Sequence, residues 1–190
     1  MAAHDQLYRY LDENSLVHPD HHGFLKNRST TTALQQLMDI WLTAAENGKI
    51  SAAILLDLSA GFDVINHKVL LSKLEEYGLD DLAISWFEDY LSQRSQCVQI
   101  ESKFSSFLNV QWGVPQGSIL GPLLFVIFIN ELPETIKLNG NNAEKEETDD
   151  DEDEEHIVVY ADDNTPTTSH EDPIILEAKT QRIADCVVCI

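Results

Sequence analysis

Apolar and polar positions along the chain follow two different periods, which predict a mixture of helices and strands. Apolar residues recur every three or four positions over about 30–46, 67–77 and 82–91, as on helices that bury one face. A threonine within 30–32 is the expected N-cap of the first helix, and Asn47-Gly48 is its expected end. Five residues are expected to form the buried face of that helix: Leu34, Leu37, Met38, Trp41 and Leu42.

Two apolar segments have the length and the β-branched content of strands, and both lead into carboxylates. Residues 50–58 predict a strand that is buried on both faces and delivers Asp57 at its end. Residues 157–160 predict a second buried strand, which runs into Asp162 and Asp163. A carboxylate at the end of a buried strand is costly unless it is paired or binds a metal ion.

Further segments add a hairpin, a partner strand and a helix. Residues 97–101 and 104–110 alternate in polarity, which predicts a hairpin. Residues 164–169 can return beside the second apolar strand as its partner. Asp172 is the expected N-cap of a helix that runs towards the C-terminus. Strands and helices therefore mix along the chain, as in an α/β domain.

A shaped loop precedes the most apolar helix of the chain. Residues 112–122 hold two prolines and three glycines, which predict a defined turn structure rather than a flexible linker. Ser118 is the expected cap of a helix over about 120–131. This helix is apolar nearly all round, so we expect it to lie in the core.

The chain is strongly acidic, with a formal net charge of −21. The run Glu144–Glu155 contributes −9 of this and the rest of the chain −12. Charge blocks of this kind usually stay unfolded, so we expect an exposed, disordered insertion that begins near Pro133. This net negative charge argues against a surface that holds nucleic acid by bulk electrostatics alone. Nucleic-acid binding would need bound cations or other segments.

No apolar run has the length that a bilayer requires, and the first residues lack the pattern of a signal peptide. Three cysteines do not suggest a disulfide framework, and a reducing compartment is the simpler interpretation. We therefore expect an intracellular protein, cytoplasmic or nuclear, with no membrane partner.

Two groups of potential metal ligands are interpreted as structural. Cys186 and Cys189 have the C-x-x-C spacing, but without a second pair or a thioredoxin pattern they are interpreted as apolar helix positions. His18, His21 and His22 lie in a polar loop without a cysteine partner, so we interpret them as solvated side chains rather than ligands.

The acidic residues at the ends of the two strands could form one metal site. Alone, Asp162-Asp163 is interpreted as a turn, because aspartate is a common turn former. If the strand of Asp57 lies beside it in one sheet, three carboxylates meet and require divalent cations, for which hard oxygen ligands favour Mg²⁺ or Mn²⁺. Two such ions about 4 Å apart promote phosphoryl transfer. This chemistry does not distinguish a polymerase from a nuclease.

Four motifs stand in a fixed order along the chain and together span most of it: His22–Thr30, Asp57–Asp63, Gly113–Phe125 and Tyr160–Asp163. They resemble the motifs of the reverse transcriptase domain of non-LTR (LINE-type) retrotransposons. The resemblance implies an α/β (α+β) fold, a reverse-transcriptase-like palm whose small antiparallel sheet is backed by helices. The disordered acidic insertion expected from the charge run is longer than the family pattern leads us to expect.

The resemblance implies roles for the acidic residues and for two neighbours in the motifs. Asp57 and Asp162 would ligate two Mg²⁺ ions, or Mn²⁺ in their place, and Asp163 would support them. Tyr160 would lie near the primer end. Arg28 would either contact nucleic acid or stabilise its own loop.

The resemblance also implies a set of nucleotide contacts. The backbone carbonyl of Leu58 could add a metal ligand. Phe62 stands where the family places an aromatic plate that excludes a 2′-hydroxyl group. Gln116 and Gly117 lie in the loop that contacts the incoming nucleotide and the template. Without the resemblance, Phe62 would be interpreted as a core aromatic residue.

By this resemblance the chain is an RNA-directed DNA polymerase that binds an RNA template, a DNA primer and deoxynucleoside triphosphates. It would form a single partial reverse transcriptase domain of four parts. These are a junction of fingers and palm (1–48), the palm with the first aspartate and the Pro-Gln-Gly loop (49–135), the acidic insertion (136–155), and the Tyr-Ala-Asp-Asp hairpin with a C-terminal helix (156–190).

The sequence also departs from the family pattern. Ala60 and Gly61 stand where the family usually has a lysine and an alanine. Most of the fingers and the thumb are expected to be missing, which leaves independent enzymatic activity open. The alternative is a catalytically inactive remnant that at most binds a metal ion or a partner. A third interpretation is an interaction protein that acts through Glu144–Glu155.

Overall fold

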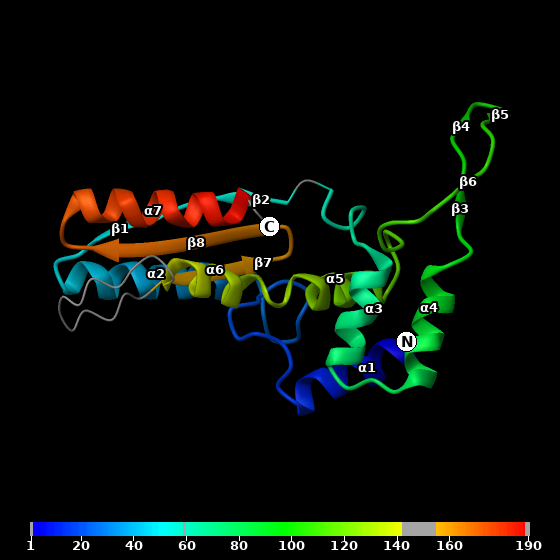
Figure 1. Cartoon of the computed structure of the whole chain (residues 1–190), viewed down its shortest axis with the longest axis horizontal. Helices are drawn as coiled ribbons and strands as arrows, with labels where there is room; N and C mark the ends of the chain where they lie inside the picture. Colours follow the sequence, from blue (N-terminus) through cyan, green and yellow to red (C-terminus); the bar gives the residue numbers. More distant parts are fainter. Residues whose placement is uncertain (1, 59, 142–154, 189–190) are drawn as a thin grey trace. The chain divides into compact units, whose positions relative to one another are not determined.

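The computed structural model describes residues 2–58, 60–141 and 155–188, which form two compact units (Figure 1). The helical unit comprises Met1–Leu16 and Ala60–Phe128. The sheet unit comprises Val17–Ser59 and Ile129–Ile190. The boundary near residue 59 separates Asp57 and Asp63, the first and last residues of one sequence motif.

The helical unit packs around an apolar helix. Its helices are α1 (Ala2–Glu13), α3 (His67–Glu76), α4 (Asp81–Leu91) and most of α5 (Gly121–Ile129). Side chains of α5 are buried nearly all round, as predicted. The Ser118 side chain accepts a hydrogen bond from Gly121 N at 3.0 Å, which confirms the predicted cap. The fully buried core of this unit includes Leu11, Leu70, Leu74, Leu91, Leu123, Leu124 and Phe125.

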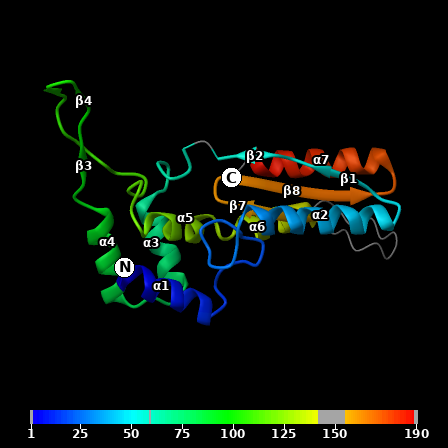
Figure 2. The same cartoon turned by 180° about the vertical axis from the view of Figure 1, so that it is seen from behind.

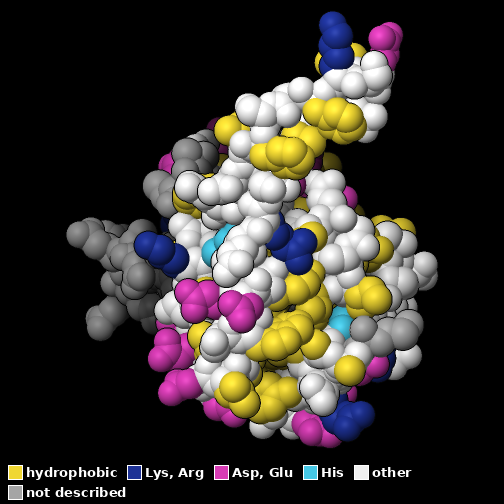
Figure 3. Space-filling view, turned by 90° about the vertical axis from the view of Figure 1, so that its right-hand side faces the viewer, with side chains coloured by type: hydrophobic (Ala, Val, Ile, Leu, Met, Phe, Trp, Pro, Cys, Tyr) yellow, Lys and Arg dark blue, Asp and Glu magenta, His cyan; other side chains and the backbone are white. Residues whose placement is uncertain are grey.

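A hairpin extends from the end of α4 (Figure 1), as the alternating pattern predicted. Its base pairs β3 (Ser95–Gln96) with β6 (Leu108–Asn109), and its tip pairs β4 (Gln99–Ile100) with β5 (Lys103–Phe104). Several hydrophobic side chains along the hairpin are exposed to solvent, as the top of Figure 3 shows. These include Val98, Ile100, Phe104, Phe107 and Leu108.

The sheet unit is built on a central strand, β8 (Asp163–His170). One edge of β8 pairs with β7 (His156–Tyr160), and its other edge pairs with β1 (Ile50–Ala53) and then β2 (Leu56–Asp57), all antiparallel. Pro166 explains why the β1–β2 edge is interrupted. Its carbonyl accepts from Ile54 N at 3.0 Å, but proline has no N–H to continue the ladder towards that edge.

The sheet is backed by helices, as the family resemblance implied, and the helices cover both of its faces (Figures 1 and 2). Helix α2 (Thr30–Glu46) lies on one face, and α6 (Leu132–Asn141) and α7 (Pro173–Val188) lie on the other. Trp41 fixes α2 by donating from Nε1 to Thr167 Oγ1 at 2.9 Å. The hydroxyl of Thr167 in turn donates to the carbonyl of Ala52 on β1 at 2.9 Å. One polar chain therefore ties helix, central strand and edge strand together.

The predicted buried face of α2 was only partly right. Leu37 and Trp41 face the sheet, but Leu34, Met38 and Leu42 are exposed. The reason is that α2 approaches the sheet through two buried alanines, Ala33 and Ala44, which turn the stripe of larger residues outwards.

Two other expectations also need correction. Segment 50–58 is an edge, not a strand buried on both faces: Ile50 and Leu55 are exposed. The stretch from Pro133 does not begin as a disordered excursion, because α6 occupies it as far as Asn141 and buries Ile136. Glu155 is also buried, against Arg182. The rest of the acidic run, 142–154, lies outside the described residues.

The N-cap of helix α2 lies one residue before the expected threonines. Ser29 is the N-cap: its Oγ accepts from Thr32 N at 3.3 Å, and Thr32 Oγ1 accepts from Ser29 N at 2.9 Å. We expect Ser29→Ala to lower the free energy of unfolding by about 1 kcal/mol, because it leaves a helix N–H without its partner. Denaturant unfolding measures this. Thr31→Ala, at an exposed position of the same turn, is the control, and equal losses in both variants would contradict the capping role.

Candidate active site

The structure places the three predicted carboxylates at the same end of the sheet. Asp57, the last residue of β2, lies directly opposite Asp163, the first residue of β8. Residues opposite each other in an antiparallel pair project from the same face. Asp162 precedes Asp163 in the turn from β7, whose last residue, Tyr160, also pairs with Asp163. Asp57 and Asp163 are exposed and Asp162 is half-buried, so the acidic group is open to solvent.

The turn that carries Asp162 is tight and held from two sides. Ala161 and Asp162 form a two-residue loop, in which Ala161 has a φ of 56° and Asp162 has no positive φ, as in a type II′ turn. The carbonyl of Asp162 accepts from Leu58 N at 3.0 Å and from Asn164 Nδ2 at 3.0 Å. Asn164 is buried and was missed by the sequence analysis, where it was only part of a partner strand.

The donor set fits a hard divalent cation. Three carboxylates of like charge placed side by side repel one another unless a cation lies between them. Within the described residues, no group of three or more His, Cys, Asp or Glu side chains is placed so that it could by itself hold a metal ion. Mg²⁺ does not need such a group, since it commonly binds one or two carboxylates and completes its shell with water and substrate phosphates. The open edge formed by Asp57, Asp162 and Asp163 suits that mode.

A loop segment that the sequence analysis treated as solvated supports this turn. His21 forms a parallel bridge with Val159 of β7, and His21 and His22 are both buried. The interpretation of these two histidines as solvated was therefore wrong. Their burial follows from pairing with a strand far along the chain, and the polar sequence around them gave no local signal of it.

His21 gives the sheet unit a pH-dependent stability. Burial, aided by the nearby charge of His18, lowers the pKa of His21 from 6.5 to about 4. Between these two pH values the unfolded chain binds a proton at His21 that the folded chain excludes. The contribution of His21 to the free energy of unfolding is therefore fully present above pH 6.5 and is lost as the pH falls towards 4. The loss attributable to His21 should reach about 3 kcal/mol. His21→Gln should remove this component in unfolding curves across that range, and an unchanged pH slope would contradict it.

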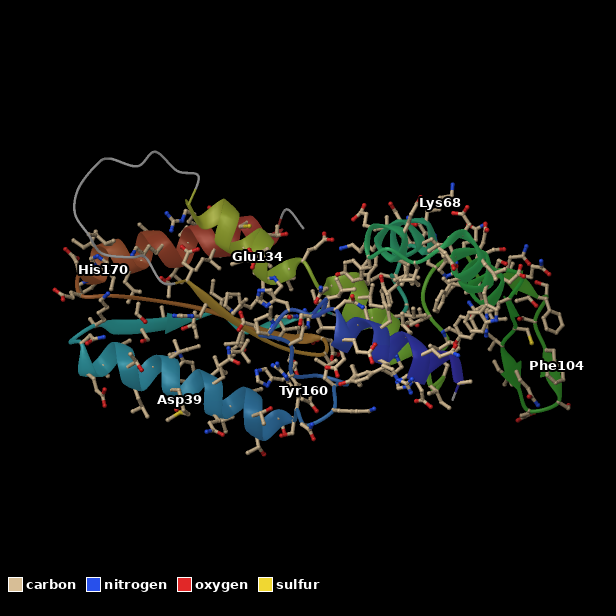
Figure 4. The ribbon with its side chains drawn as sticks, turned by 90° about the horizontal axis from the view of Figure 1, so that it is seen from below. Asp39, Lys68, Phe104, Glu134, Tyr160 and His170 are labelled. Carbon is tan, nitrogen blue, oxygen red and sulfur yellow. The ribbon has the colours of Figure 1, made fainter. Side chains whose placement is uncertain are left out.

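Arg28 and Tyr160 lie in the same unit as the carboxylates. The guanidinium of Arg28 donates a hydrogen bond to the carbonyl of Pro19 and so supports its own loop. This matches one of the two roles considered for Arg28. Tyr160 is half-buried at the end of β7 (Figure 4).

The predicted nucleotide contacts other than Leu58 lie in the helical unit. Phe62 stacks on Phe125 of α5, with ring centroids 4.5 Å apart. Gln116 donates from Nε2 to the carboxylate of Asp63 at 3.0 Å. Gly117 has a φ of 79°, which suits a glycine in a turn. The structure thus joins the Pro-Gln-Gly loop to the turn that follows the first aspartate.

The backbones of these two loops are also in direct contact. Val114 N donates to Phe62 O at 2.9 Å, and Gly113 N donates to Ile65 O at 2.8 Å. A side chain on Gly113 would come within 2.8 Å of Asp63 Cα, so this approach needs glycine. A cavity of about 780 Å³ opens beside Asp63 and Gln116, and Arg94 and Trp112 also line it.

Comparison with known families shows to which family the chain belongs. The family model described as "Reverse transcriptase (RNA-dependent DNA polymerase)" matches residues 2–187. The chain belongs to the reverse transcriptase family. Its candidate carboxylates, its Pro-Gln-Gly loop and the His21 bridge to β7 all fall within the matched part.

Relatives of this reverse transcriptase chain include proteins of non-LTR retrotransposons. It is 32% identical over 122 residues to the "Probable RNA-directed DNA polymerase from transposon BS" of Drosophila melanogaster, covering 60% of this chain and 13% of the relative. It is 31% identical over 111 residues to the RNA-directed DNA polymerase from the mobile element jockey of the same species, covering 58% of this chain and 12% of the relative. The chain therefore corresponds to a small part of these proteins.

Solved telomerase structures share the fold. The chain superposes on apo telomerase from Candida tropicalis with a TM-score of 0.61 at 14% identity, covering 98% of this chain and 36% of that one. For telomerase from Candida albicans, in a complex with a fragment of telomeric RNA, the TM-score is 0.66 at 12% identity, over 95% and 31%. These likenesses confirm the predicted palm fold. In the part of the chain that the structure describes, no helix is long and apolar enough to cross a bilayer.

Proposed function

We propose that this chain is the palm of an RNA-directed DNA polymerase and that Asp57, Asp162 and Asp163 are its catalytic, metal-binding residues. One observation carries the proposal: Asp57 lies opposite Asp163 in the β2–β8 pair, beside the turn that bears Asp162. The family match over residues 2–187 supports it. The reaction is attack of a primer 3′-hydroxyl on the α-phosphate of a deoxynucleoside triphosphate, with pyrophosphate as the leaving group.

The acidic edge would hold two divalent cations, Mg²⁺ or Mn²⁺. When bound, such ions neutralise the triphosphate and stabilise the attacking and leaving oxygens of the displacement. The contribution of the chain is to fix the ligands: the pairing of β2 with β8 sets Asp57 against Asp163, and two hydrogen bonds to its carbonyl fix Asp162. Because the chain has a net charge of −21, we expect cations at this edge to carry much of the attraction for phosphate.

Other residues would position the substrates, an RNA template, a DNA primer and a deoxynucleoside triphosphate. The Leu58 carbonyl is a further oxygen ligand, and Tyr160 is placed near the primer end. Phe62 would exclude a 2′-hydroxyl, and its stack on Phe125 would keep the ring from rotating away. Gln116 and Gly117 would contact the incoming nucleotide and the template, with Asp63 orienting the Gln116 amide.

Primer extension tests this function. The purified chain is given a DNA primer annealed to an RNA template, Mg²⁺ and four deoxynucleoside triphosphates, and is compared with Asp162→Asn. We expect the wild type to extend the primer and the variant to lose that activity, while both unfold cooperatively. If neither protein extends the primer although both are folded, the chain is an inactive remnant and the proposal fails.

A further inference from the structure

Gly23 lies against the backbone of the turn that carries Asp162. A Cβ atom on Gly23 would be 2.4 Å from Ala161 N, 3.1 Å from Ala161 Cα and 3.3 Å from Ala161 Cβ. Non-bonded heavy atoms are comfortable at about 3.5–4.0 Å. Gly23 does not have a positive φ, so the position requires the absence of a side chain and not the conformational freedom of glycine.

The segment that contains Gly23 is paired with the strand leading into the turn. Val159 N donates to Asp20 O at 2.9 Å, and His22 N donates to Val159 O at 2.7 Å. These two bonds flank the parallel bridge between His21 and Val159. The Asp20–Gly23 segment therefore acts as a short additional strand beside β7, and it ends where the turn begins.

Side chains anchor the same segment to α2. The ring of His22, itself buried, lies 2.8 Å from Thr32 Oγ1 through Nδ1 and 2.6 Å from Gln36 Oε1 through Nε2. Gln36 Nε2 donates to Asp20 Oδ1 at 2.7 Å. Because Asp20 and His22 are both hydrogen-bonded to α2, the segment cannot shift easily if a side chain at position 23 pushes against the turn.

We propose that Gly23 is a positioning residue: by lacking a side chain, it lets the anchored Asp20–Gly23 segment support the Ala161–Asp162 turn and fix Asp162 relative to Asp57. A methyl group there would move the turn by about 1 Å, the difference between 2.4 Å and ordinary contact. The structural part stands on contacts alone. The catalytic part rests on the proposed polymerase function.

The amide of Leu58 reports the position of the turn without any substrate. Leu58 N donates to Asp162 O, and Ile54 N, on the same edge of the sheet, donates to Pro166 O, both at 3.0 Å. In Gly23→Ala we expect hydrogen exchange of the Leu58 amide to accelerate at least tenfold relative to wild type, with little change at Ile54. A general loss of stability would accelerate both amides.

Two further variants make this test decisive. The first adds Ala161→Gly to Gly23→Ala. It removes the Ala161 side chain, and glycine lets the backbone at position 161, whose φ is 56° in the wild type, move more easily. The double variant should therefore restore much of the protection of the Leu58 amide. Gly48→Ala is the matched control, because Gly48 has a φ of 74° but nothing within 4 Å of a Cβ. It should cost stability through backbone strain and leave the Leu58 amide no more affected than Ile54.

The proposal is overturned if the Leu58 amide exchanges in Gly23→Ala as it does in wild type, or if Leu58 and Ile54 accelerate equally. If Gly23→Ala does not fold, the matched control decides: a folded Gly48→Ala supports the steric conflict at Gly23, and a Gly48→Ala that also fails to fold contradicts it.

The catalytic consequence is measured separately as single-nucleotide addition with Mn²⁺. A displacement of about 1 Å at a reacting site can cost about a hundredfold in rate, and we expect that loss in Gly23→Ala, with partial rescue in the double variant. A wild type without activity would defeat the proposed function but not the exchange result. An active Gly23→Ala with a displaced turn would defeat the catalytic part.

Discussion

Asp57→Asn is expected to slow primer extension about a thousandfold while leaving the fold intact. The substitution keeps the shape of the side chain but removes an anionic ligand from the position opposite Asp163. Metal ions supply several kcal/mol of transition-state stabilisation, and about 1.4 kcal/mol corresponds to a tenfold change in rate. The rate of single-nucleotide addition at saturating triphosphate measures the effect.

Stability separates a catalytic loss from a structural one. Like charges directly opposite each other in a sheet are destabilising, so without divalent ions Asp57→Asn should be at least as stable as wild type. The control is Asp39→Asn, the same chemical change at an exposed position on the outer side of α2 (Figure 4). It should extend primers at the wild-type rate. A variant at Asp57 that keeps activity within a factor of a few would show that this carboxylate is not a ligand.

Phe125→Ala is expected to lower the free energy of unfolding by about 3–5 kcal/mol, a large part of the stability of an ordinary domain. Phe125 is 1% exposed, and its ring supports Phe62 at 4.5 Å. The substitution therefore opens a cavity in the core of the helical unit and removes an aromatic stack. Denaturant unfolding measures the loss.

Phe107→Ala is the matched control, because Phe107 is 70% exposed on the hairpin. It should change stability by no more than about 0.5 kcal/mol. If the two substitutions cost the same, α5 does not form the core that its all-round apolar sequence predicted.

Features with local causes could be predicted from the sequence. The end of α2 at Asn47 and the cap of α7 at Asp172 follow from side chains that bond neighbouring backbone groups. The hairpin near Ser102 follows from alternation over a few residues. The sequence predicted that Asp57 would lie near the Asp162-Asp163 pair only on the condition that their strands share one sheet, and the structure pairs Asp57 with Asp163.

Features set by distant partners could not be predicted in the same way. The sequence did not indicate that β8 is central and pairs with β2, and Pro166 would have argued against a central strand. The outward turn of Leu34 and Met38 depends on how closely α2 approaches the sheet. Gly23 appeared only as one residue of a motif, and its contact with Ala161 became visible only in three dimensions.

Counting bound Mn²⁺ by electron paramagnetic resonance tests most directly whether the three carboxylates form a metal site. The chain is mixed with an RNA–DNA hybrid whose primer ends in a 3′-deoxy nucleotide, together with the next triphosphate, and is compared with Asp162→Asn. A two-metal site predicts two bound ions for the wild type and a clear loss for the variant. Equal Mn²⁺ binding by both proteins would contradict the assignment of Asp57, Asp162 and Asp163 as the metal ligands.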